Sequence, residues 1–221
     1  MSSKPDAATA CLPPANCRLC PRLADFLATQ RAAHPDWFNA PVPPFGDPDA
    51  RLAIIGLAPG LRGANATGRP FTGDFAGELL YGSLIAHGFA KGHYAASPDD
   101  GLTLHDAIII NAVRCVPPQN KPTTEEIRTC NRFLSCELEN RPQLRIILAL
   151  GKIAHDAVLM AEGLVRARWK FAHGARHELP SGLVLHDSYH CSRYNTQTRR
   201  LTPRMFHDIL AKIRTELAHT A

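Results

Sequence analysis

The fold is decided by residues 51–89, RLAIIGLAPGLRGANATGRPFTGDFAGELLYGSLIAHGF. The apolar run Leu52–Leu57 predicts a buried strand, because an unbroken stretch of this length fits a strand covered on both faces. A loop rich in glycine and proline follows at 58–74. The next segment, from Phe75 to about Phe89, predicts a helix whose inward residues are Phe75, Leu79, Leu80 and Leu84.

The same alternation continues to the C-terminus. Further buried strands are predicted at 105–113 (HDAIIINAV), 145–150 and 183–186. Thr123 to Glu126 has the capping-box pattern and predicts a helix with one face formed by Ile127, Cys130, Leu134 and Leu138. A second helix follows Gly151, and Pro203 opens the last one, with Phe206, Ile209, Leu210, Ile213 and Leu217 inward. Strands alternating with helices predict a three-layer α/β/α sandwich around a central, mostly parallel four-stranded sheet.

The remaining segments set the domain organisation. Residues 1–16 are rich in Ala, Pro and Ser and predict a flexible N-terminal arm, so that residues 17–221 form a single domain. Five prolines within 34–50 predict an extended connector. Residues 163–182 carry basic and aromatic side chains and predict a hairpin or a long loop.

Composition narrows the class of protein. Of the 221 residues, 45% are hydrophobic and 20% charged, which is typical of a folded soluble chain. The formal charge of +5 and the sequence pI of about 8.9 suit a polyanionic partner. No apolar segment is long enough for a signal peptide or a membrane span, so we expect a cytoplasmic protein. Its seven cysteines then indicate metal binding, catalysis or burial rather than disulfides.

The unusual sequence lies where predicted strands end. Three loops do so: APGLRGANATGRPFTGD at 58–74, NAVRCVPPQNKP at 111–122 and DSYHCSRYNTQTRRLT at 187–202. Parallel sheets bind ligands at the carboxyl ends of their strands, so these loops should converge on one site. Asn111 ends a very apolar strand and needs polar partners there. Its amide offers both a donor and an acceptor to a ligand, although it could instead tie down a neighbouring loop.

These loops, together with Cys17–Cys20 (CRLC), resemble the uracil-DNA glycosylase superfamily, specifically family 5 (type B). The matching stretches are 17–20, 56–74, 111–122 and 189–202, in the family's order. The resemblance implies a monofunctional DNA glycosylase for uracil and related deaminated bases. It implies a monomer that acts on DNA, in the cytoplasm and associated with the nucleoid.

The resemblance also implies roles for residues of the base pocket. Phe71 would stack on the flipped base, Asn111 would bind its polar edge, and His190 would donate a hydrogen bond to the uracil O2 as charge develops. Gly56, Ala58 and Gly60 would line the base. Gly60 stands where uracil-specific relatives have a bulky Tyr, which predicts a broader substrate range. Each side chain also has a plainer reading: Phe71 as a buried loop aromatic and His190 as a core histidine.

The water-activating group is the least settled of these roles. Some superfamily members carry an acidic residue at the position of Ala58, and the nearest replacement here is Asp74. Asp74 either orients the attacking water or caps the helix that begins at Phe75, since Asp is a favoured N-cap residue.

The loop at 187–202 would contact DNA. Ser192 would hold the phosphate beside the flipped nucleotide, Tyr194 would fill the gap left by the base, and Arg193 and Arg199 would lie on the backbone. A solvated surface loop is the alternative for the two arginines. The chain departs from the family pattern at Ala66, Cys191 and Arg199.

Four cysteines resemble the family's cluster ligands: Cys17, Cys20, Cys115 and Cys130. Four thiolates suit a [4Fe–4S] cluster or zinc, and spacing alone does not choose between them; the resemblance favours iron–sulfur. Cys130 also fits a plain core position, and Cys11, Cys136 and Cys191 are taken as non-ligands. Two other classes of protein remain open, a metal-stapled nucleic-acid-binding module without catalysis and an iron–sulfur sensor. The joint presence of Phe71, Asp74, Asn111 and His190 argues against both.

Overall fold

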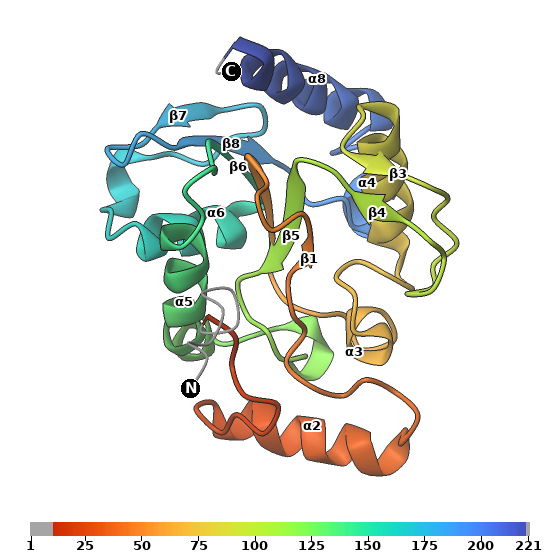
Figure 1. Ribbon diagram of the computed structural model, residues 1–221. Coiled ribbons are helices and arrows are strands. Elements are labelled where there is room, and N and C mark those ends of the chain that lie inside the picture. Colours follow the sequence, from red (N-terminus) through yellow and green to blue (C-terminus); the bar gives the residue numbers. More distant parts are fainter. Residues whose placement is uncertain (1–10, 220–221) are drawn as a thin grey trace, which may run out of the picture.

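The central sheet has six strands in the order β1-β5-β2-β6-β8-β7 (Figure 1). The computed structural model describes residues 11–219. Four strands in the middle of the sheet are parallel: β5 (Ala107–Asn111), β2 (Leu52–Gly56), β6 (Ile146–Leu150) and β8 (Val184–Ser188). The first three are buried at every position, because helices cover both faces of the sheet. The predicted α/β/α sandwich is confirmed.

The two edge strands were not predicted. β1 (Phe45–Gly46) pairs antiparallel with β5 and lies in the proline-rich connector. β7 (Arg176–Glu178) pairs antiparallel with β8, so the segment at 163–182 does contain a hairpin strand. Both are too short, and too poor in apolar residues, to give a periodic signal. The prediction of four strands therefore describes the parallel core. Within residues 11–219 the sheet also contains the two antiparallel edge strands β1 and β7.

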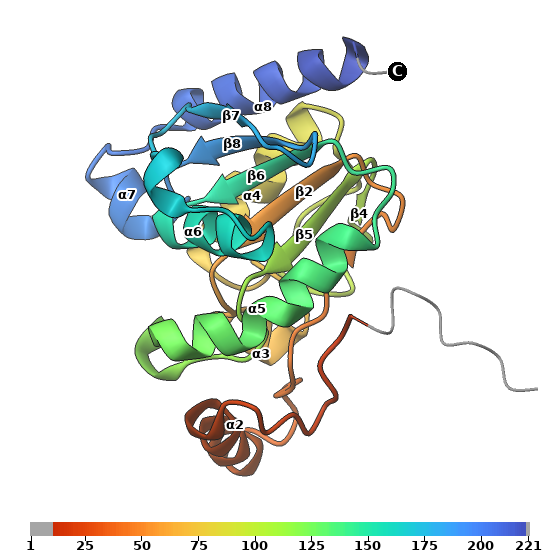
Figure 2. The ribbon, with the colours of Figure 1, turned by 90° about the vertical axis from the view of Figure 1, so that its left-hand side faces the viewer.

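Helices cover both faces of the sheet (Figure 2). Helices α4 (Phe75–Ala86) and α8 (Pro203–His219) lie on one face, and α5 (Thr124–Glu139) and α6 (Lys152–Ala161) on the other. Thr123 and Glu126 form the predicted capping box at the start of α5. All five inward residues predicted for α8 are buried. No helix within residues 11–219 combines the length and apolar character that a bilayer span requires.

Smaller elements complete the fold. Helix α2 (Pro21–Ala33) packs Leu23 and Leu27 against Val113 and Val116, in the loop that follows β5. The short elements are α3 (Ala64–Thr67), β3 (Ala90–Lys91), β4 (Thr103–Leu104), η1 (Pro118–Asn120), η2 (Arg166–Arg168) and α7 (Arg193–Gln197). One inward assignment is wrong: Phe75 is 40% exposed, because the first residue of α4 faces the sheet edge rather than the core.

The N-terminal segment carries a disulfide. The part of the expected arm at residues 1–10 lies outside the described residues. From Cys11 onward the chain is held against the fold, since Cys11 is buried and bonded to Cys136 of α5. The expectation that the cysteines form no disulfide is therefore wrong for this pair. A bridge that spans 125 residues closes a long loop and constrains the unfolded chain.

Candidate functional site

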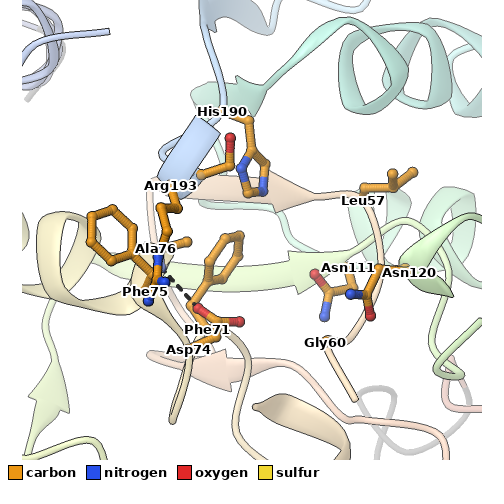
Figure 3. Close-up of a pocket in the computed structure, with 12 residues that line it drawn as sticks. Leu57, Gly60, Phe71, Asp74, Phe75, Ala76, Asn111, Asn120, His190 and Arg193 are labelled. Carbon is orange, nitrogen blue, oxygen red and sulfur yellow. Dashed lines mark hydrogen bonds between the residues drawn. The ribbon is translucent and has the colours of Figure 1, made fainter. Parts of the chain in front are cut away.

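A cavity of about 360 Å³ opens at the carboxyl edge of the parallel strands (Figure 3). The loops after β2, β5 and β8 supply most of its wall, as expected for ligand sites in such sheets. The lining residues are Leu57, Ala58, Gly60, Phe71, Asp74, Phe75, Ala76, Asn111, Asn120, His190, Ser192 and Arg193. The structure thus brings together most of the residues that the sequence singled out.

Gly56 lies beneath this cavity and permits its geometry. A Cβ atom at this position would lie 2.5 Å from Oδ1 of Asn111 and 2.8 Å from the ring of Phe71. Real side chains do not approach so closely, so any larger residue would push these two groups apart. Glycine at the end of β2 is what allows the amide and the aromatic ring to meet over one spot.

Asn111 presents an unpaired acceptor. The side chain is 2% exposed, and its Oδ1 has no hydrogen-bond partner among the described residues. A buried polar atom without a partner costs about 1–3 kcal/mol. Because Asn111 lines the cavity, the missing donor is one that a ligand would supply. The alternative in which this amide ties down a neighbouring loop receives no support from its contacts.

Phe71 is held in a strained backbone conformation. Its φ is +56°, in the left-handed region that residues with a side chain rarely adopt, at a typical cost of about 1–3 kcal/mol. The hydroxyl of Tyr94 donates to the carbonyl of Phe71 at 3.1 Å and helps to hold this conformation. The ring centroid lies 5.7 Å from that of His190. Figure 3 shows both rings beside the cavity, with Asn111 across from them.

His190 is kept neutral. Burial lowers the pKa of its imidazole to about 4, because surrounding protein disfavours the charged ring. A neutral imidazole carries one N–H, which can donate to a ligand atom that gains negative charge. A side-chain hydrogen bond also holds this loop, since Nδ2 of Asn195 donates to the backbone carbonyl of His190 at 2.8 Å.

Asp74 uses its two carboxylate oxygens differently. Oδ1 accepts from the backbone N–H groups of Ala76 and Gly77 at 3.0 and 3.2 Å, so the N-cap role on α4 is confirmed. Oδ2 faces Gly60 and Gly63, where added Cβ atoms would lie 3.3 and 2.9 Å from it. Burial raises the pKa of this carboxyl, and the two backbone hydrogen bonds oppose the rise. One oxygen therefore holds the helix while the other stays available to the cavity.

The loop after β8 places its predicted DNA contacts at different depths. Ser192 and Arg193 line the cavity, and the guanidinium of Arg193 lies 5.1 Å from the ring centroid of Phe75. Tyr194 is outside the cavity wall and 70% exposed, and Arg199 is exposed with a φ of +56°. Ser192 also caps α7, since its Oγ accepts from the N–H of Asn195 at 3.4 Å. Cys191 is fully buried in the apolar core and does not face the cavity.

Four lining residues were missed by the sequence analysis. They are Leu57, Phe75, Ala76 and Asn120. Asn120 had a usable signal, because it lies in the loop that begins with Asn111. Its Oδ1 accepts from the N–H of Leu61 at 3.3 Å, which ties that loop to the one after β2. Phe75 was assigned to the core because a helical period cannot reveal which residue stands at a sheet edge.

The four predicted ligand cysteines lie around a second cavity, between α2, α5 and the loop after β5. Cys17, Cys20, Cys115 and Cys130 all line it. Burial, reinforced by the neighbouring sulfurs, raises the pKa of Cys115 to about 12 and that of Cys20 to about 11. Thiols crowded in this way ionise only when a cation joins them. The donor set therefore fits a thiolate-bound metal group.

The spread of the sulfur atoms bears on the size of that group. No three of these four Sγ atoms lie within 4.8 Å of one another. A tetrahedral zinc ion with Zn–S bonds of about 2.3 Å would hold its sulfurs roughly 3.8 Å apart. The arrangement is thus wider than a single zinc ion needs. In addition, the backbone N–H of Arg114 donates to Sγ of Cys130 at 3.4 Å, a contact that favours a thiolate.

The arrangement at the sheet edge defines a class of protein. An aromatic ring, an unpaired amide and a neutral imidazole face one cavity, beside a carboxylate oxygen. Such a cavity holds a flat heteroaromatic ring by its face and by its polar edge, and places a hydrogen-bond donor where charge can develop. The fold and the site are thus those of an α/β enzyme that captures a planar base.

Comparison with known proteins names the family. A family model described as the Uracil DNA glycosylase superfamily matches residues 43–214, and the chain belongs to this superfamily. It is 48% identical over 200 residues to a type-5 uracil-DNA glycosylase of Thermus thermophilus, covering 88% of this chain and 90% of that protein. A type-5 uracil-DNA glycosylase of Pyrobaculum aerophilum is 39% identical over 202 residues, 89% and 87% of the two chains. A type-4 uracil-DNA glycosylase of Archaeoglobus fulgidus is 35% identical over 115 residues, 51% of this chain and 49% of that protein.

Proposed function

We propose that the protein is a monofunctional DNA glycosylase that hydrolyses the N-glycosidic bond of uracil and related deaminated bases. The single observation that carries this proposal is the unpaired Oδ1 of Asn111, buried in a cavity with Phe71 and His190. The donor that this oxygen lacks is present on uracil as N3–H. Relatives that align with most of the chain bear the name uracil-DNA glycosylase.

The base would be held in three ways once it is flipped out of the duplex. Its face would stack on Phe71, its N3–H would donate to Oδ1 of Asn111, and Nδ2 of Asn111 would donate to its O4. Extrusion of a base costs a few kcal/mol, least at a mismatch such as G·U. The satisfied amide and the stacking contact would offset that cost. Gly60 lines the cavity without a side chain, so a base with a group at its 5-position would also fit.

The reaction breaks the bond between N1 of the base and C1′ of the sugar. The electron pair leaves with the base, and the N–H of His190 would stabilise the negative charge on O2. A water molecule then forms the new bond to C1′ and loses a proton, and the released base anion takes up a proton at N1. Oδ2 of Asp74 would orient this water and stabilise the positive sugar, while Oδ1 keeps the helix start in place.

The exposed part of the loop after β8 would bind the DNA strand. Ser192 and Arg193 at the cavity rim would contact the phosphates beside the flipped nucleotide. Tyr194 is free in this structure to enter the space that the base leaves. Arg199 would add a backbone contact.

The four cysteines would hold a [4Fe–4S] cluster through Cys17, Cys20, Cys115 and Cys130. The wide spacing of their sulfurs favours this cluster over a single zinc ion. When bound, the cluster supplies a structural tie rather than redox chemistry, because hydrolysis transfers no electrons. Cys115 follows Asn111 by four residues, so the cluster would hold the loop that presents the amide. We further propose one glycosylase domain from residue 17 to 221 that acts as a monomer in the cytoplasm, near the nucleoid.

A uracil-containing duplex tests the proposal. The protein should release uracil and leave an abasic site, so the strand breaks only after alkali. A duplex with thymine at the same place is the control. Binding of the uracil duplex without base release would contradict catalysis and favour a binding module.

The iron content of the purified protein tests the cluster. The protein should contain iron and absorb broadly in the visible range. Cys115→Ser should lose the iron and the absorbance, while Cys191→Ser should keep both. Zinc in stoichiometric amount without iron would contradict the cluster.

A further inference from the structure

A second group of metal-binding side chains lies away from the base pocket and away from the four ligand cysteines. His155 comes from α6, His177 from β7 and Asp187 from β8. One nitrogen of each histidine and one oxygen of the carboxylate all lie within 4.8 Å of one another. The side chains of His155 and Asp187 have no exposed surface, and that of His177 is 16% exposed. Nothing in the proposed glycosylase mechanism uses these residues.

The hydrogen bonds of His155 orient it as metal-binding histidines are oriented. Its Nε2 lies 3.0 Å from the carbonyl oxygen of Trp169, and a carbonyl only accepts, so Nε2 carries the hydrogen. Its Nδ1 lies 2.7 Å from Oδ1 of Asp187. Histidines that bind metals commonly donate their second ring N–H to a carbonyl in this way, which leaves the other nitrogen for the ion. Nε2 of His177 lies 3.3 Å from Oδ2 of the same carboxylate.

We propose that Nδ1 of His155, Nε2 of His177 and the carboxylate of Asp187 form a binding site for one divalent transition-metal ion, with Zn²⁺ as the best match. Imidazole nitrogens with a carboxylate oxygen are a ligand set that zinc accepts. The fourth position of a tetrahedral ion would be taken by water, on the side where His177 is exposed. Two nitrogens and one oxygen do not suit Ca²⁺ or Mg²⁺, which require mostly oxygen ligands.

The spacing fits an ion with small side-chain shifts. Bonds of about 2.0–2.1 Å in a tetrahedral arrangement hold ligand atoms roughly 3.3 Å apart. Nδ1 of His155 lies 2.7 Å from Oδ1 of Asp187, and Nε2 of His177 lies 3.3 Å from Oδ2 of the same carboxylate. One nitrogen of each ring and one carboxylate oxygen lie within 4.8 Å of one another. Aromatic rings enclose the group, since Phe171 packs edge-on against His155 and Trp169 against His177. These rings limit solvent access to the side on which His177 is partly exposed.

A proton occupies the same place when no ion is bound. His155 then lies between a carboxylate and a carbonyl, so both of its nitrogens must donate. Burial lowers the pKa of His155, but the hydrogen bond and charge of Asp187 outweigh burial, and its net pKa is raised. Asp156 of α6 adds to the rise, and His177 is the remaining titratable neighbour.

The site would brace the region just before the catalytic loop. Asp187 lies in β8, and His190 follows it by three residues in the loop after this strand. An ion held by α6, β7 and β8 would add direct bonds between three elements that the side chain of Asp187 already links through hydrogen bonds. We expect it to raise the melting temperature and to leave the chemical step unchanged, because no ligand touches the base cavity.

Titration of the purified protein with its cysteine site loaded tests this proposal. Co²⁺ is the spectroscopic probe and Zn²⁺ the competitor. One equivalent of Co²⁺ should give visible d–d bands without the sulfur-to-metal charge-transfer band that thiolate ligands produce, and Zn²⁺ should displace it. The melting temperature of the protein should rise with the first equivalent of metal.

Variants assign the ligands. His177→Gln and Asp187→Asn should each weaken binding at least tenfold, since loss of one of three protein ligands removes a direct bond. The matched control is His186→Gln, on the same strand but facing α8, where its Nε2 pairs with Oε2 of Glu216 at 2.9 Å. This histidine–carboxylate pair has no third ligand, so the control should keep full affinity.

Two results would overturn the proposal. One is the absence of any Co²⁺ binding outside the cysteine site in the wild-type protein, which needs no variant to fold. The other is binding that His177→Gln and Asp187→Asn leave unchanged. Either result would show that His155 and Asp187 form only a buried proton-mediated pair. Neither would affect the proposed glycosylase, whose base release is measured separately.

Discussion

Replacement of Gly56 by alanine isolates the geometry of the base pocket, because it adds one methyl group and changes no polar atom. The new Cβ would lie 2.5 Å from Oδ1 of Asn111 and 2.8 Å from the ring of Phe71. Carbon atoms in contact normally stay about 3.5–4.0 Å apart, so these groups must separate by roughly 1 Å. Both are buried and packed, which leaves them little freedom to move without losing their positions.

The expected loss follows from that displacement. A misplacement of about 1 Å in a catalytic arrangement costs roughly 10²-fold in rate, or about 2.7 kcal/mol in the barrier. Overpacking would also lower the free energy of unfolding by about 1–3 kcal/mol. The rate should be measured under single turnover, with enzyme in excess over a G·U duplex, so that product release does not mask the chemistry. Melting and circular dichroism would establish that the variant is folded at the assay temperature.

Gly82→Ala is the matched control. Gly82 lies within α4, and a Cβ there would meet nothing within 4 Å. This change should leave the rate unaltered and raise the free energy of unfolding by about 0.5–1 kcal/mol, because alanine favours the helix. A Gly56→Ala variant that excises uracil at the wild-type rate would refute the assigned close approach of Asn111 and Phe71.

Three further predictions separate the roles of single pocket residues. Asp74→Asn keeps an oxygen for the α4 cap but loses the charge on Oδ2, so its single-turnover rate should fall ~10²-fold or more while its melting temperature stays nearly unchanged. Asp74→Ala should also lower the free energy of unfolding by about 1 kcal/mol, because the cap is lost. Equal rates for Asp74→Asn and wild type would contradict the water-orienting role. Burial lowers the pKa of His190 to about 4, so as the pH falls below about 6.5 the unfolded chain takes up this proton before the folded protein does. The free energy of unfolding should therefore decrease as the pH falls from about 6.5 to about 4. His190→Gln should reduce this decrease in a series of denaturation curves measured at different pH values. Gly60→Tyr should place a ring in the cavity beside the base and lower activity on 5-hydroxymethyluracil more than on uracil in paired excision assays, and strict uracil specificity of the wild type would contradict the steric argument.

The parallel core of the sheet could be predicted because each of its strands is a continuous apolar run between loops. The edge strands could not, because β1 has two residues in a proline-rich segment and β7 has three that are largely polar. They pair only because a neighbouring strand is already in place. The disulfide had no local signal either, since Cys11 and Cys136 are 125 residues apart.

The candidate site was predictable as a set of residues and unpredictable in its details. Asn111 and His190 could be placed together because both follow predicted parallel strands. At Asp74, one carboxylate oxygen caps α4 and the other faces Gly60 and Gly63. This orientation of the side chain cannot be read from the sequence. Asn120 enters the wall through positive φ angles at Gln119 and at itself, a backbone path that the residue types alone do not specify.

The order in which the cavity wall appears along the chain has a consequence for biosynthesis. The first residue of the wall along the chain is Leu57 and the last is Arg193. The last lining residues follow β8, a strand that must pair with β6. A chain emerging from the ribosome therefore has no intact pocket until nearly all of it has been translated. Incomplete products, whether from stalled synthesis or from proteolysis before this strand, should be unable to remove bases from DNA.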